Sequence, residues 1–324
     1  MAKLHRPRHG SLQFYPRKRA EKIVPSANWF FLEQFAERNN IKGLLGFLGY
    51  KVGMVSCVAK DNTPNSLTKN KQIVLPLTLI ECPGMKVFSI RLLKNKLVKS
   101  EIISDSIEKE VKRKIKIPKK IKKIDFEKIN KEDYDDIRLL CYSLARKTFK
   151  KTPEIFEIGL AGNFEEKLSK AKELFGKEIS ISEFFKKSML VDSYGLTKGK
   201  GIQGPMKRFG LEKKQHKSEK GVRNPGSLGP WHPARVLFRA PIAGQLGWFT
   251  RVQYNNKVID IEEKHFEKLN QKKGFGGYGI IRNPCILIKG SLQGSSKRPI
   301  LLTISQRPTK KLFKQNYELV KIER

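Results

Sequence analysis

The sequence predicts a mainly β protein with α insertions, in which the strands form a β-barrel that carries long basic extensions. Short runs rich in β-branched and aromatic residues, bounded by Gly, Pro and Asn, mark the strands. These runs fall into two groups far apart in the chain, and helical patterns do not alternate with them as in a parallel βαβ fold. A sheet built from distant halves of the chain with Gly-rich corners favours a barrel.

Residues 1–42 are predicted to form a basic N-terminal extension and a short helix. Met1 to Lys22 carries seven basic residues and one acid, Glu21, and its prolines and glycine oppose regular structure. This stretch is expected to be an extended arm. Ser26 to Arg38 (SANWFFLEQFAER) is predicted to be a short aromatic helix.

Residues 43–106 are predicted to supply the first part of the barrel. The segments GLLGFLGYKVGMVSCVA, QIVLPLTLIEC and KVFSIRLL are short, apolar and separated by turn residues. We expect them to be neighbouring strands of one sheet.

Residues 107–188 are predicted to be a helical insertion. Its first part, Ile107 to Lys123, mixes Lys and Ile around Pro118 and is expected to be a solvated loop without a specific role. Lys131 to Thr148 has apolar residues at helical spacing and acids near its start, so it is predicted to be a helix. A second helix is expected to be capped by Asn163, with Glu166 three residues later, and to stop at Gly176.

Residues 189–324 are predicted to form the remainder of the barrel. Strand character returns at Met189 to Thr197 and in ARVLF, LGWFTRVQYN, KVIDIE, GIIRNPCILIKGS and RPILLTIS. The basic loop at residues 198–233 interrupts them, with nine Lys/Arg up to Arg223 and few apolar residues before Leu228. Such a segment cannot bury itself, so it stays extended unless a partner of opposite charge supplies contacts.

Overall charge points to a polyanionic partner. The 67 Lys+Arg against 31 Asp+Glu leave a formal net charge of +36. Neutralising phosphates with Lys and Arg releases condensed counterions and gives strong, salt-sensitive binding without base readout. Nucleic acid is therefore the leading partner class, and the 39% apolar content is enough for a real core besides.

Several other classes of protein are disfavoured. There is no run of about 18 apolar residues and no secretory signal pattern, so we expect a soluble, intracellular protein without membrane contact. The four widely spaced cysteines indicate buried free thiols in a reducing compartment. Gly199, Gly201 and Gly204 spell GxGxxG, but Pro205 and basic residues follow instead of an apolar helix, so a glycine-rich hinge is favoured over a dinucleotide site. No catalytic or metal motif is present, and no cofactor or small-molecule substrate is expected.

Trp231 has two interpretations of equal weight. Pro230 and Pro233 hold it extended after the basic loop. It is either a core tryptophan that anchors the return of the loop or an aromatic tip that stacks on folded RNA.

Five segments together resemble the family of universal large-subunit ribosomal protein three. They are RPRHGSL with PRKRA, GFLGYKVGM, VDSYGLTKGKGIQGPMKRFG, GPWHPAR and GYGIIRNPCILIKGSLQGSSKRP. The similarity spans nearly the whole chain in the right order, and WHPAR and PRHGSL are typical of the archaeal and eukaryotic branch.

The resemblance implies a closed β-barrel of the type shared with translation factors and some reductases. It also implies an N-terminal arm and a central loop that run through rRNA, with the tip, here Trp231, near the peptidyl transferase centre. The implied role is structural: binding 23S-type large-subunit rRNA, nucleating subunit assembly and supporting the catalytic and factor-binding regions, in the cytoplasm and beside neighbouring ribosomal proteins. Eukaryotic members carry a histidine twelve residues before the tryptophan, whereas this chain has Glu219, so that feature is not transferred to His216.

The residues predicted to bind rRNA are basic, aromatic or histidine side chains of the arm, the loop and the last strands. They are Arg6, Arg8, His9, Arg17, Lys18, Arg19, Lys198, Lys200, Lys207, Arg208, Lys213, Lys214, Arg223, Trp231, His232, Arg235, Lys289 and Arg298. Two rival functions stay open at this point: an RNA-modifying enzyme, motivated by the glycine-rich loop, and a basic DNA-binding protein of the chromatin type.

Overall fold

The chain divides into two compact units. The computed structural model describes residues 10–118, 133–144, 148–263, 269–270 and 273–323. The first unit, named the arm–loop unit, comprises residues 1–23 and 196–251. The second, named the sheet unit, comprises residues 24–195 and 252–324.

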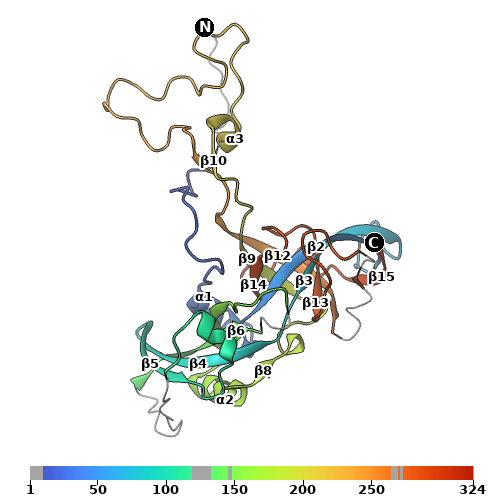
Figure 1. Cartoon of the computed structure of the whole chain (residues 1–324). Coiled ribbons are helices and arrows are strands. Elements are labelled where there is room, and N and C mark those ends of the chain that lie inside the picture. Colours follow the sequence, from blue (N-terminus) through green and yellow to red (C-terminus); the bar gives the residue numbers. More distant parts are fainter. Residues whose placement is uncertain (1–9, 119–132, 145–147, 264–268, 271–272, 324) are drawn as a thin grey trace. The chain divides into compact units, whose positions relative to one another are not determined.

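The larger sheet curls into a half-barrel (Figure 1). Strand β14 pairs with β9 on one side, where Leu301 lies opposite Tyr194, and with β2 on the other, where Ile300 lies opposite Gly49. All residues of β9 and β14 are buried, which explains their continuous rather than alternating apolar pattern. The strand order is β14 (Pro299–Ile304), β9 (Leu190–Leu196), β12 (Thr250–Glu262), β13 (Cys285–Lys289), β3 (Gln72–Glu81), β2 (Gly46–Asp61) and β15 (Tyr317–Glu323).

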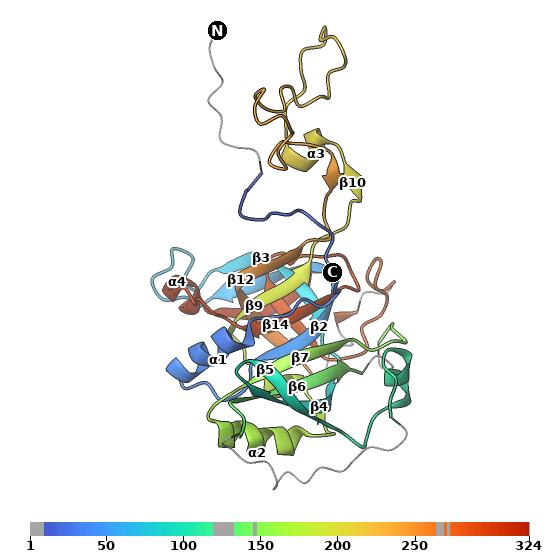
Figure 2. The same ribbon diagram turned by 90° about the vertical axis from the view of Figure 1, so that its left-hand side faces the viewer.

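A second, smaller sheet carries the two longest helices of the described chain (Figure 2). Helix α1 packs on β7, and α2 packs on β6. The strand order is β1 (Gly43–Leu44), β7 (Ile155–Ala161), β6 (Asp136–Ser143), β4 (Met85–Lys94) and β5 (Leu97–Ile103), with β8 (Glu178–Ile179) pairing with β4. The helices described in this unit are α1 (Trp29–Arg38), α2 (Phe164–Leu174), α4 (Lys310–Phe313) and the 3-10 turns η1 (Lys109–Arg113) and η5 (Ile181–Glu183).

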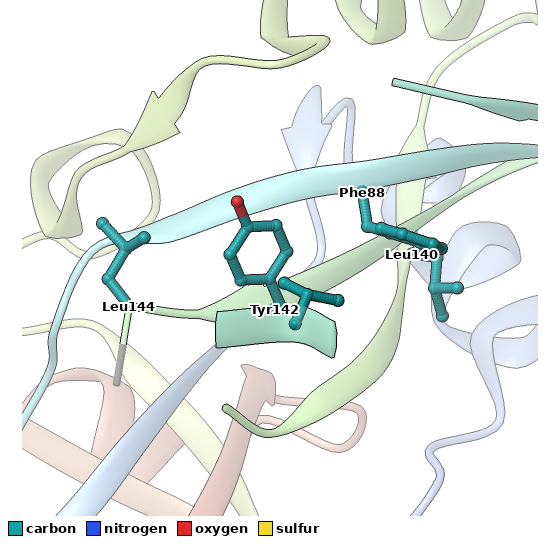
Figure 3. Close-up of a cluster of buried hydrophobic side chains, with 5 residues drawn as sticks. Phe88, Leu140, Tyr142 and Leu144 are labelled. Atoms are coloured by element: carbon teal, nitrogen blue, oxygen red, sulfur yellow. The ribbon is translucent and has the colours of Figure 1, made fainter. Parts of the chain in front are cut away.

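One face of the smaller sheet holds a buried apolar cluster. Phe88, Leu140, Tyr142 and Leu144 point together there, and Val111 of η1 completes the cluster (Figure 3). Three isoleucines of the Lys/Ile segment, Ile107, Ile115 and Ile117, pack against it. The expectation of a solvated loop from Ile107 to Lys123 is therefore wrong for its described part, because its isoleucines are used as core. Residues 119–123 lie outside the described residues.

The helix predicted over Lys131 to Thr148 is wrong, because its described centre is the strand β6. Both faces of β6 are covered: Ile137, Leu139 and Cys141 are fully buried on one side, and Leu140 and Tyr142 face the apolar cluster on the other. A short, continuous apolar run of this kind has no period that separates a buried strand from a helix. The insertion at 107–188 thus contributes β6, β7 and β8 besides α2.

The two predicted helices that pack on the smaller sheet, on β7 and β6, are confirmed. Helix α1 occupies most of Ser26 to Arg38, and α2 follows a capping box between Asn163 and Glu166. Gly176 lies just beyond α2 in the left-handed conformation, at φ +70°.

Other strand predictions succeed in part. The segments of β2, β3, β9, β13 and β14 are confirmed as strands, but KVFSIRLL forms β4 in the smaller sheet rather than beside β2 and β3. LGWFTRVQYN and KVIDIE belong largely to the single strand β12. ARVLF (234–238) is not a strand, because it pairs with none of the described strands and its side chains are exposed. The sequence does not predict strands β5, β7, β8 and β15, nor β10 (Ile202–Gln203) and β11 (Gly244–Gln245) of the arm–loop unit.

A buried charge cluster joins α1, α2 and β6. Lys167 Nζ lies 3.2 Å from Glu33 Oε2 and donates to Asp136 Oδ1 at 2.7 Å. Arg138 Nε lies 3.3 Å from Asp136 Oδ2 and 4.0 Å from Glu33 Oε1, and its Nη1 lies 3.5 Å from Glu157. Burial is the main cause that raises the pKa of Glu33 to about 7, and the negative charge of Asp136 is the second. The positive charges of Lys167 and Arg138 lower this pKa but do not offset the rise.

Glu33→Gln is expected to remove a pH dependence of stability. The folded pKa of Glu33 lies above its ordinary value of 4.5, so the folded state binds the proton more tightly, and stability falls as pH rises from about 4.5 to about 7. The loss amounts to at most about 3 kcal/mol at 1.36 kcal/mol per pKa unit. Urea unfolding at pH 5 should give similar stabilities for both proteins, and at pH 8 the variant should be the more stable. Asp133→Asn, at a half-exposed carboxylate paired with Lys99, is the control and should follow the wild-type profile. A Glu33→Gln profile parallel to the wild-type profile would contradict the assignment.

Candidate nucleic-acid interface

Positive charge is concentrated in the arm–loop unit. Its 79 residues carry 19 Lys/Arg and 3 Asp/Glu, whereas the 245 residues of the sheet unit carry 48 and 28. The net positive charge per residue is thus more than twice as high in the arm–loop unit. Such a surface attracts a polyanion before any specific contact forms.

The loop begins and ends on a two-stranded stem. Thr197 N donates to Phe249 O and Lys200 N to Leu246 O, both at 3.0 Å. The short strands β10 (Ile202–Gln203) and β11 (Gly244–Gln245) continue this antiparallel pairing. Gly247 is required in the stem, because its φ is +73° and a Cβ would lie 1.9 Å from the Lys198 carbonyl oxygen.

The GxGxxG sequence opens a five-residue helix, α3 (Pro205–Phe209), and not the long apolar helix of a dinucleotide site. Pro205 occupies its first position, and Gly210 ends it in the left-handed conformation. This geometry speaks against a dinucleotide site at this position, and the glycine-rich hinge stays a prediction.

The arm is fastened to the stem by backbone and aromatic contacts. Ala20 N donates to Trp248 O at 3.0 Å, and Trp248 Nε1 donates back to Ala20 O at 3.1 Å. Arg17 stacks over the Phe209 ring at 4.4 Å and donates to Arg208 O at 3.2 Å. Residues 10–23 and the stem therefore present their basic side chains from one joined body.

Arg208 is partly committed to the protein itself. Its guanidinium donates to the carbonyl oxygens of Gln245 at 3.0 Å and Ile242 at 2.9 Å. Burial, and next the charge of Arg17, lower the pKa of Arg208. Arg17 and Arg208 thus brace the stem, and only their remaining N–H groups are left for a partner.

The segment from 211 to 241 is almost entirely exposed, and Trp231 is its most exposed aromatic residue. The Trp231 side chain is 88% exposed, so the interpretation as a core residue is wrong. Trp231 lines an open hollow of about 430 Å³ formed by residues 228–231 and 233–236. Leu228, Val236 and Phe238 are exposed as well, which leaves apolar surface among the basic residues.

The structure brings most of the predicted residues into one unit. Arg17 and Arg208 are half-buried, and the exposed members are Lys18, Arg19, Lys198, Lys200, Lys207, Lys213, Lys214, Arg223, Trp231, His232 and Arg235. Lys289 and Arg298 belong to the sheet unit, where Lys289 Nζ donates to Tyr317 Oη at 2.8 Å. Arg6, Arg8 and His9 lie outside the described residues.

Sequence reasoning missed two arginines of this unit. Arg251 stacks over Phe14 at 4.6 Å, and Arg239 is exposed between Phe238 and Ala240. Arg239 directly follows Phe238 in the sequence, and one residue separates Arg251 from Phe249. This pairing of arginine with a nearby aromatic residue is a signal that could have drawn attention to them.

The part of the chain that the structure describes shows no candidate metal site. Among the described residues, no group of three or more His, Cys, Asp or Glu side chains could hold a metal ion. All four cysteines are buried free thiols. No helix in the described part of the chain has the length and apolar character needed to cross a membrane.

Known proteins match the chain over nearly its full length. The family model of "Ribosomal protein L3" matches residues 1–323. The large ribosomal subunit protein uL3 of Methanocaldococcus jannaschii is 38% identical over 323 residues, which cover 96% of this chain and 94% of that protein. The protein of the same name from Archaeoglobus fulgidus is 39% identical over 324 residues, covering 96% and 95%. The similarity therefore includes both the arm–loop unit and the sheet unit.

Proposed function

This chain belongs to the ribosomal protein L3 family, and from that premise we propose that its arm–loop unit is the part that binds folded large-subunit rRNA. A member of this family is a structural protein of the large ribosomal subunit and not an enzyme. It contacts large-subunit rRNA and neighbouring ribosomal proteins in the cytoplasm. The finer assignment to the arm–loop unit is supported by its charge of 19 Lys/Arg against 3 Asp/Glu.

We further propose that Trp231 is a stacking tip of this unit. In this proposal, the loop supports the peptidyl transferase centre and the factor-binding region, and the protein nucleates subunit assembly. The single observation that carries the proposal is the 88% exposure of the Trp231 indole between two prolines. An indole left in water at the end of a basic segment gains by stacking on a base, about 1–3 kcal/mol per stacked base in comparable cases.

For the sheet unit, we propose that the half-barrel is a closed barrel of the translation-factor type. The pairing of β14 with both β9 and β2 supports this proposal. The four-part division at residues 42, 106 and 188, with the loop at 198–233, is proposed from the sequence pattern, with β4 and β5 assigned to the smaller sheet.

The experiment that tests the rRNA assignment is a competition at one salt concentration. Labelled large-subunit rRNA transcribed in vitro is bound to the full-length chain at about 0.15 M salt, and unlabelled rRNA or duplex DNA is added at equal phosphate concentration. Unlabelled rRNA is expected to displace the label at a far lower concentration than DNA does. Equal displacement by both competitors would show that the protein binds polyanions in general, without selectivity for rRNA.

Trp231→Ala is expected to weaken rRNA binding by about 1–3 kcal/mol and to leave DNA binding unchanged. The matched control is Phe313→Ala, which removes an aromatic ring of the sheet unit that is 69% exposed. An equal effect of both variants would contradict the role of Trp231.

A further inference from the structure

Two glycine-rich loops of the sheet unit lie side by side. The first is the turn at residues 273–279 (KGFGGYG), and the second is the loop at residues 290–298 (GSLQGSSKR). A Cβ built on Gly277 would lie 3.9 Å from the Ser296 Cβ, so the two loops touch at that point.

The first loop is anchored on both sides of its two central glycines. The Phe275 side chain is buried near Gly53, and the Tyr278 hydroxyl donates to the buried carboxylate of Glu81. Phe275 N donates to Gly279 O at 2.9 Å, which closes the turn. The backbone of Gly276 and Gly277 is thereby held at the surface.

Gly276 is a glycine that neither backbone nor packing requires. Its φ lies outside the left-handed region, and a Cβ there would meet nothing within 4 Å. Among the glycines in the described part of the chain, only Gly204 shares both properties. At such a position glycine makes the folded protein no more stable than alanine would, because glycine loses more conformational freedom on folding. It does let another molecule approach closely.

The second loop is held rigid by a buried lysine. Lys51 Nζ donates to the carbonyl oxygens of Leu292 at 2.5 Å and Gly294 at 3.2 Å. Arg298 N donates to Ser295 O at 3.3 Å, so Ser295 to Arg298 form a turn. Lys297 stands at the third position of this turn with φ +69°, where glycine or asparagine is preferred. A non-glycine residue kept in that conformation points to a use for its side chain.

We propose that Gly276, Gly277, Ser296 and Lys297 form a preorganised contact surface for the sugar–phosphate backbone of folded RNA. The backbone N–H groups, a hydroxyl and the Lys297 ammonium group are the donors that phosphate oxygens accept from. The Lys297 side chain is exposed, and its Nζ lies 5.4 Å from the centroid of the Phe149 ring. Residues 273–298 contain five Lys/Arg and no Asp or Glu, which favours a polyanion over a protein surface. The inference rests on the proposed rRNA binding and adds a second site, in the sheet unit, to the arm–loop unit.

Two substitutions separate binding from folding. Gly276→Ala is expected to keep or slightly raise the melting temperature, because the added methyl group meets open space, while weakening rRNA binding several-fold. Lys297→Gly is expected to raise the melting temperature by relieving the turn and to weaken binding about four- to five-fold at 0.15 M salt. The slope of log K against log salt should fall in magnitude by about 0.7–0.9, as for one lost phosphate contact.

The control is Lys96→Gly in the turn between β4 and β5. Lys96 is also a lysine in the left-handed conformation, at φ +65°, and its Nζ lies 4.1 Å from the Phe30 ring. This variant removes the same charge and the same strain elsewhere in the sheet unit, so its rRNA affinity should change by less than about two-fold.

The probe is in-vitro transcribed large-subunit rRNA with the full-length chain, titrated between about 0.1 and 0.4 M salt. One outcome is that the wild-type chain prefers rRNA over DNA while Gly276→Ala and Lys297→Gly have the rRNA affinity of the wild-type chain. In that case this inference fails and the proposed function stands. A lowered melting temperature for Gly276→Ala would make that glycine structural and would overturn its part of the surface. If the wild-type chain showed no preference for rRNA over DNA, the proposed function itself would be contradicted.

Discussion

Replacing Lys207, Lys213, Lys214 and Arg223 together with glutamine is expected to weaken rRNA binding by a factor on the order of 10² to 10³ at 0.15 M salt. All four side chains are exposed in the arm–loop unit and are available to phosphates. Each phosphate contact adds about 0.7–0.9 to the salt slope, so four lost contacts lower its magnitude by about 2.8 to 3.6. A filter-binding titration at several salt concentrations measures both quantities.

A matched control removes the same charge from the sheet unit. Lys69, Lys71, Lys112 and Lys116 are exposed there, and their joint replacement by glutamine lowers the net charge by the same amount. If affinity followed net charge alone, both quadruple variants would lose binding equally, and the arm–loop unit would have no special role. A small effect of the control beside a large effect of the loop variant supports the assignment.

Glu81→Ala is expected to be the most destabilising single substitution we propose, at roughly 4 kcal/mol or more. The Glu81 side chain is 1% exposed, and its Oε1 accepts from Arg282 N at 2.9 Å, Asn283 N at 2.8 Å and Asn283 Nδ2 at 2.7 Å. Its other oxygen accepts from the Tyr278 hydroxyl. Removing the carboxylate leaves these buried donors without a partner, and each costs about 1–3 kcal/mol. Urea unfolding of the full-length chain measures the loss.

Tyr278→Phe tests the same network more gently. Burial and the neighbouring Glu81 raise the pKa of Tyr278, so its phenol keeps the proton that it donates. Removing only this hydroxyl should cost much less than Glu81→Ala, because Glu81 retains the three N–H donors. Equal losses for the two variants would mean that the Glu81 carboxylate stabilises the loop mainly through Tyr278.

Strands that alternate or are bounded by turn residues could be predicted from the sequence, whereas a buried strand without such boundaries could not be told from a helix. Strand β14 was found because Pro and Ser flank its apolar run. The sequence predicts a helix at β6 because both faces of this strand are covered, so apolar and polar residues do not alternate along it. The assignment of β4 to a second sheet depends on pairing with β6, a tertiary fact that no local pattern carries.

The exposed charged residues of the candidate interface could be predicted, whereas the contacts that some of them make within the protein could not. Exposed Lys213 and Lys214 follow from charge and low apolar content alone. The bracing role of Arg208 depends on carbonyl oxygens 34 and 37 residues away. The character of Gly276 likewise appears only when the space around its Cα is known.

The stem of the loop has a consequence for how the chain tolerates change. Thr197 and Phe249 pair across the stem, so the chain leaves and rejoins its strands at neighbouring points. Doubling the length of a flexible segment between fixed ends costs only about 0.6 kcal/mol. Insertions and deletions beyond the stem can therefore accumulate during evolution without disturbing the register of β9 and β12.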